Sequence, residues 1–85
     1  MSPTTLDQAR PGQRMVVLGV EGATRPEWAF RLEELGFVSG EPLQMLRRGF
    51  FGGDPLMVRV GGSVFALRGA EAACVRVALL PETLP

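Results

Sequence analysis

With 85 residues, 46% of them hydrophobic and 21% charged, the chain has room for one small domain with a single modest core. Nine basic residues, all arginine, balance nine acidic ones, and this zero net charge argues against a nucleic-acid partner and a polybasic membrane anchor. Lysine and histidine are absent, which excludes a P-loop, Ser-His-Asp and Cys-His triads, and zinc-protease sites.

The chain is predicted to begin with a loose end, a turn and a strand. Residues 2–5 are typical of a frayed or loosely attached terminus. Ala9–Gly12 contains a Pro-Gly pair, in which proline fixes φ and glycine permits a positive φ, so a turn is predicted there. Arg14–Val20 is rich in β-branched and apolar residues and is bounded by glycines, which predicts a strand.

One short helix is predicted to follow this strand and to end at Gly36. The segment Thr24–Glu27 has the spacing of a capping box, with a proline in the first turn. Three apolar residues recur at helical spacing and predict the stripe that faces the core: Trp28, Leu32 and Leu35. Counting about 100° per residue, Phe30 lies roughly opposite that stripe.

The remaining sequence is predicted to be β. Strands are expected at Pro42–Arg48, Leu56–Val60, Ser63–Leu67 and Cys74–Leu79. Gly49–Pro55 is a glycine-rich loop, and Gly61-Gly62 is a hairpin signal because tight hairpin turns need positive φ. Gly69–Ala73 allows one short helical turn.

About five strands and one short α-helix inserted after the first strand predict a mainly β fold. A lone sheet of that size would leave one face wet, so closure into a small SH3-like barrel is expected. We expect a single domain over residues 1–80, followed by a C-terminal tail at residues 81–85.

Aromatic residues outside the predicted core are the candidate partner-binding residues. Phe30 is one, with burial under another loop as the alternative. Phe50 and Phe51 are adjacent, so they are not expected to enter one core pocket together. One of them is expected to cap the end of the barrel, which leaves the other as a candidate contact. Arg47 lies beside this loop and is included, with a simple solvated face as its alternative.

No catalytic, cofactor-binding or metal-ligating residue is predicted. No candidate nucleophile has a candidate base, and no G-x-G-x-x-G motif occurs. Tight Fe(II) or Zn(II) sites usually draw on His and Cys, and this chain offers only Cys74 among scattered carboxylates. The remaining alternative is a weak divalent metal site built from carboxylates of two chains.

Cys74 cannot form an internal disulfide, and this favours a reduced, cytoplasmic setting. The longest apolar stretch, Met15–Val20, is far shorter than the roughly 20 residues that span a bilayer. No charged segment followed by an apolar one opens the chain, so no secretory signal is expected. We therefore expect a cytoplasmic protein without direct membrane insertion.

Four motifs in a fixed order carry a resemblance to a known family. They are Leu6-x-x-Ala9-x-Pro11-Gly12, Arg31-Leu32-x-x-Leu35-Gly36-Phe37-x-x-Gly40, Gly53-Asp54-Pro55-x-x-Val58-x-Val60 and Ala66-Leu67-Arg68-x-x-Glu71-Ala72-x-x-Val75-x-Val77. From Leu6 to Val77 the chain resembles the ferrous iron transport protein A family, FeoA. The resemblance implies a small cytoplasmic SH3-like protein with an accessory or regulatory role in bacterial Fe(II) uptake.

The partner that this resemblance implies is the membrane transporter FeoB, which carries its own GTP-binding domain and would recruit the chain to the inner face of the membrane. The alternative is a stand-alone SH3-like regulatory module with a different protein partner, related to the C-terminal domain of iron-dependent repressors. A repressor itself is not expected, because no DNA-binding helix pair precedes the domain. Small barrels also bind single-stranded nucleic acid, but the charge balance argues against it. The oligomeric state stays open, and a homo-oligomer is one outcome.

Overall fold

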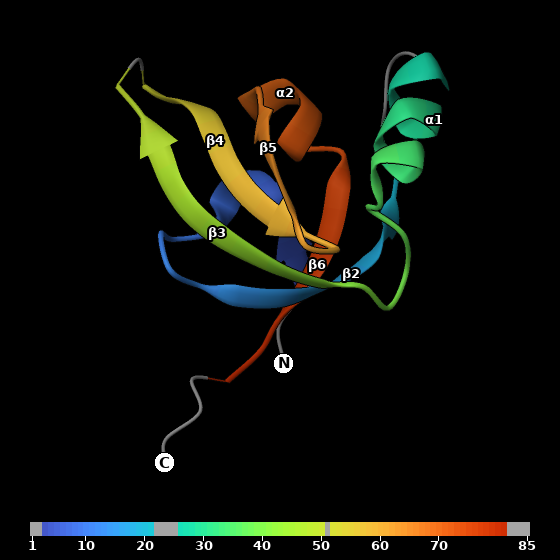
Figure 1. The fold of residues 1–85 in the computed structure, drawn as a ribbon, viewed down its shortest axis with the longest axis horizontal. Helices are drawn as coiled ribbons and strands as arrows, with labels where there is room; N and C mark the ends of the chain where they lie inside the picture. The colour runs from blue at the N-terminus through green and yellow to red at the C-terminus, as the bar shows by residue number, and fades with distance from the viewer. Residues whose placement is uncertain (1–2, 22–25, 51, 82–85) are drawn as a thin grey trace.

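The computed structural model describes residues 3–21, 26–50 and 52–81, which form a curved sheet with two short α-helices (Figure 1). The elements in chain order are β1 (Pro3–Thr5), the 3-10 helix η1 (Leu6–Gln8), β2 (Arg14–Val20), α1 (Pro26–Leu35), β3 (Pro42–Gly49), β4 (Gly53–Val60), β5 (Ser63–Leu67), α2 (Gly69–Ala72) and β6 (Val75–Leu79). The mainly β class and the helix after Arg14–Val20 agree with the prediction.

All six strands belong to one antiparallel sheet in the order β1-β6-β2-β3-β4-β5. β6 lies between β1 and β2, so the two ends of the described chain meet in the sheet. Val77 of β6 pairs with Thr4 on one side and with Val17 on the other. The other strands follow in sequence order, which places β3 and β4 beside each other as a long hairpin (Figure 1).

The sheet differs from the prediction in two details. Pro3–Thr5 is a strand and not a frayed end, because its backbone pairs with β6. The sheet is also not closed into a full barrel: among the described residues, β1 and β5 are its two edges and do not pair. Instead, η1, which follows β1, contacts α2, which follows β5.

One cluster of buried apolar side chains fills the inside of the sheet. β4 shows the predicted period-two pattern, because Leu56, Val58 and Val60 are buried while Arg59 between them is exposed. Phe37 is also fully buried, and its ring lies 6.1 Å from that of Phe65. The connection between α1 and β3 therefore contributes a large side chain to the core.

α1 packs against this core with the predicted stripe. Leu32 is 2% exposed, and Trp28 and Leu35 are partly buried against the cluster. The helix ends in a Schellman arrangement: Phe37 N–H donates to the Leu32 carbonyl at 3.0 Å, and Gly36 has a positive φ of 117°. Thr24 and Arg25 of the predicted capping box lie outside the described residues.

Candidate partner-binding surface

Phe30 lies on the face of α1 that does not touch the core. Its side chain is 64% exposed, whereas Leu32, two residues along the same helix, is buried. Residues two apart on a helix point in directions about 200° apart, which is why one faces the core and the other faces solvent. No described loop covers the ring, so Phe30 is available for contact with a partner.

Phe50 is fully exposed at the tip of the β3–β4 hairpin. The strands run further into the predicted glycine-rich loop than expected, because Gly49 pairs with Gly53 and only three residues of the sequence separate the two. A Cβ atom at Gly49 would lie 2.0 Å from the carbonyl oxygen of Asp54, so only glycine fits there. This tight closure presents Phe50 to solvent.

Of the other two predicted contact residues, Phe51 and Arg47, the structure describes only Arg47. Phe50 is not the ring expected to cap the barrel end, because it is fully exposed, and Phe51 lies outside the described residues. Arg47 is exposed on β3 and has no ion pair or hydrogen bond from its side chain to the described residues. Its location is therefore compatible with a contact beside Phe50.

Arg48, next to Arg47, holds η1 against the sheet. Its Nη2 atom donates to the carbonyl oxygens of Asp7 and Ala9, the second at 3.1 Å. Of these two adjacent arginines, Arg47 is thus exposed and Arg48 has a structural role. The β-bulge between Met45 and Arg47 sets this orientation, because strict alternation from the buried Met45 would turn Arg47 inward and Arg48 outward.

Phe30 and Phe50 belong to elements that are well separated in the fold. α1 and the β3–β4 tip lie on opposite sides of the molecule in a view with the longest axis horizontal (Figure 1). The molecule extends 41 × 29 × 23 Å. The predicted contact residues thus include two separate aromatic positions, and a partner that touches both must extend across the domain.

The groups that could bind a metal or act as nucleophiles are few and separated. Cys74 is buried, and its thiol donates to the Ala70 carbonyl at 3.5 Å. Burial, reinforced by the carboxylates of Glu71 and Asp7, raises the pKa of this thiol, so it stays protonated at neutral pH. In the part of the chain that the structure describes, no three Cys, Asp or Glu side chains come together as a metal site.

A second surface feature was not predicted from the sequence. Arg14, Gln44 and Arg59 lie beside one another on β2, β3 and β4 and line a groove on the outside of the sheet. They are far apart in the sequence, and only the strand order and register bring them together. Strand alternation marks each of them as outward-facing but does not show that they are neighbours.

Comparison with known proteins decides the family. The family model for the FeoA domain matches residues 4–79 of this chain. The chain belongs to the FeoA family. The predicted family is therefore confirmed, over slightly more of the chain than the four motifs cover. The comparison with curated proteins gave no match.

Solved FeoA structures share the fold of this FeoA-family chain. FeoA from Stenotrophomonas maltophilia, crystallised with zinc, is 42% identical over 88% of this chain and 89% of that chain, with a TM-score of 0.79. FeoA from Chlorobium tepidum, solved by solution NMR, is 32% identical over 95% of this chain and 74% of that chain, with a TM-score of 0.81. The first is described as a prokaryotic SH3 domain protein, and this confirms the predicted SH3-like fold.

A manganese-dependent transcriptional repressor has the same fold in one part. It superposes with a TM-score of 0.81 at 21% identity, over 94% of this chain and 38% of the repressor. At that identity the likeness shows the fold alone. Within the described residues of this FeoA-family chain, no helix has the length and apolar character needed to cross a membrane.

Proposed function

We propose that this FeoA-family chain is a cytoplasmic accessory protein of bacterial ferrous iron uptake, which acts by binding the transporter FeoB and not by catalysis. The family match over residues 4–79 supports the iron-uptake role, as does the description of the Stenotrophomonas maltophilia relative as a candidate activating factor for ferrous iron transport. The observation that carries the binding role is the exposure of Phe30 and Phe50.

An exposed aromatic ring gains free energy when a partner covers it. The rings of Phe30 and Phe50 contribute little to the core, so packing within the domain does not require a phenylalanine at either position. Covering one aromatic side chain at the centre of an interface is commonly worth about 2 kcal/mol or more, roughly thirtyfold in affinity. Arg47 adds a charge beside Phe50, and an arginine at the rim of an interface contributes to orientation more than to affinity.

We propose that FeoB contacts both aromatic positions, with Phe30 on α1 and Phe50, together with the predicted Phe51 and Arg47, at the β3–β4 end. Because the two positions are separate, the losses of binding free energy from removing each ring are expected to add in the double variant. This distinguishes the proposal from a single aromatic patch, in which loss of one ring would disturb the other.

The test is ferrous iron uptake by bacteria that contain FeoB and lack a FeoA protein. The wild-type chain should change the uptake rate, and the direction of the change shows whether the protein activates or restrains transport. A variant with Phe30→Ala and Phe50→Ala should leave uptake at the level of cells without the chain. Val64→Ala, which removes an exposed side chain from β5, is the matched control and should act like the wild type. A double variant that is present at normal levels and changes uptake as the wild type does would disprove the proposal.

A further inference from the structure

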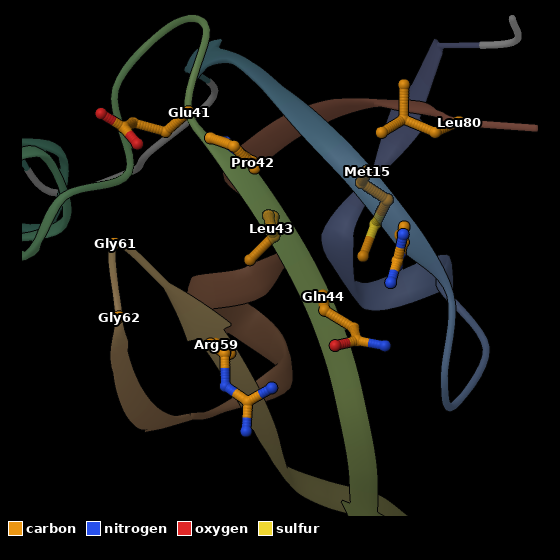
Figure 2. A pocket seen from close by; sticks show the side chains of 10 residues that line it. Met15, Glu41, Pro42, Leu43, Gln44, Arg59, Gly61, Gly62 and Leu80 are labelled. Atoms are coloured by element: carbon orange, nitrogen blue, oxygen red, sulfur yellow. The ribbon is translucent and has the colours of Figure 1, made fainter. Parts of the chain in front are cut away.

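A groove of about 430 Å³ lies on the outer face of the sheet and includes neither Phe30 nor Phe50. β3 runs along its middle, β2 lies on one side and the β4–β5 turn at Gly61-Gly62 on the other (Figure 2). Leu80 forms part of its wall and is tied to β2, because its N–H donates to the Arg14 carbonyl at 3.0 Å. The groove is thus built mainly from three strands of the sheet and the β4–β5 turn.

Three polar side chains form one row across this groove. In the strand register, Arg14 of β2 lies opposite Gln44 of β3, and Gln44 lies opposite Arg59 of β4. The three residues are therefore side by side on adjacent strands. Their strand neighbours Met15 and Leu43 are buried, which directs the row to the outside. Two strand spacings separate the arginine backbones, about 10 Å.

The two guanidinium groups lack an anion within the described structure. Neither Arg14 nor Arg59 makes a side-chain ion pair or hydrogen bond there, although other arginines do. Gln44 lies between them, and its Nε2 donates to the Gly12 carbonyl at 3.3 Å. This bond turns the amide oxygen of Gln44 toward Arg59 (Figure 2). Two like charges with one neutral residue between them repel each other, and a bound anion would relieve that repulsion.

We propose that this groove binds an extended peptide segment of a partner protein that carries one carboxylate next to apolar side chains. The carboxylate fits between Arg14 and Arg59, because guanidinium groups match the two oxygens of a carboxylate. The apolar side chains fit against Pro42 and Leu80, which line the same groove. Glu41 also lines it, and its negative charge disfavours polyanions such as nucleic acid. Charge complementarity thus selects a singly charged, partly apolar segment.

The test is an NMR titration of the ¹⁵N-labelled full chain with the blocked peptide acetyl-Pro-Leu-Glu-Leu-Pro-amide. The signals of the Gln44 side-chain amide and of the Arg14 and Arg59 backbone amides should shift together. The same peptide with Gln in place of Glu should bind more weakly. Removing one exposed charge contact is expected to weaken binding about two- to fivefold, so Arg14→Gln with Arg59→Gln should weaken it about tenfold.

Arg10→Gln with Arg68→Gln is the matched control, since it removes the same charge from exposed positions outside the groove and should leave the affinity unchanged. The proposal is wrong if the Glu and Gln peptides bind equally, if the control pair weakens binding as much, or if none of the three signals shifts. Tighter binding of inorganic phosphate or oligothymidylate than of the peptide would also overturn it, in favour of a polyanion site. None of these outcomes depends on Phe30, Phe50 or FeoB.

Discussion

At the scale of single residues, the pair Arg47 and Arg48 shows how one position in a strand separates a surface residue from a structural one. Arg48 satisfies two backbone carbonyls of the segment Asp7–Ala9, while Arg47 points to solvent. Without the Arg48 side chain, these carbonyl oxygens would accept a hydrogen bond from water or from no donor. Hydrogen bonds that involve a charged group also stabilise a fold more than neutral ones do.

Arg48→Ala is therefore expected to lower the free energy of unfolding by about 1–3 kcal/mol. Arg47→Ala should change it by less than about 0.5 kcal/mol, as surface substitutions usually do. Urea denaturation of the two variants beside the wild type measures both values. Equal stability of the two variants would mean that the bonds from Arg48 to η1 contribute nothing to folding.

Cys74 gives the protein a distinctive response to alkaline pH. Tyrosine and lysine are absent from the chain, so Cys74 is the only side chain whose ordinary pKa lies between about 8 and 11. Burial, with Glu71 and Asp7, raises its pKa in the folded state. The unfolded chain then loses the thiol proton first, and the free energy of unfolding falls as pH rises above about 8.5.

Thermal melts between pH 8 and pH 10 should therefore show a falling Tm for the wild type and a nearly constant Tm for Cys74→Ala. The comparison is between slopes, so the cavity that the substitution leaves does not affect the result. Parallel slopes for the two proteins would show that the alkaline effect comes from another source.

At the scale of elements, α1 divides its side chains between the core and solvent. Leu32→Ala should destabilise the protein by about 2–5 kcal/mol, as truncation of a buried leucine does. Phe30→Ala should leave the melting temperature nearly unchanged, because 64% of that side chain is already exposed. Differential scanning calorimetry of both variants checks this. A large loss of stability in Phe30→Ala would assign Phe30 to the fold and remove it from the proposed surface.

At the scale of the whole molecule, local patterns in the sequence predict the elements well. The spacing of Trp28, Leu32 and Leu35 predicts the buried side of α1, and Gly61-Gly62 predicts the β4–β5 turn. β1 is missed because three residues at a sheet edge carry no hydrophobic pattern of their own and are held by backbone pairing with β6.

These local patterns do not specify how residues far apart in the sequence are placed relative to one another in the fold. The distance between Phe30 and Phe50 depends on how α1 and the β3–β4 hairpin are placed around the core, which periodicity does not specify. The same holds for the row Arg14, Gln44 and Arg59, which requires the register of three strands. Phe37 is missed as a core residue because it follows the glycine that ends the helix and belongs to no helical or strand pattern of its own.

The most direct test of the binding role is the affinity between the purified chain and purified, detergent-solubilised FeoB, measured by biolayer interferometry. The wild type should bind. Phe30→Ala and Phe50→Ala should each weaken binding about thirtyfold, while Val64→Ala should keep the wild-type affinity. Absence of wild-type binding to FeoB that still binds GTP, or an unchanged affinity in the variant lacking both rings, would contradict the proposed function.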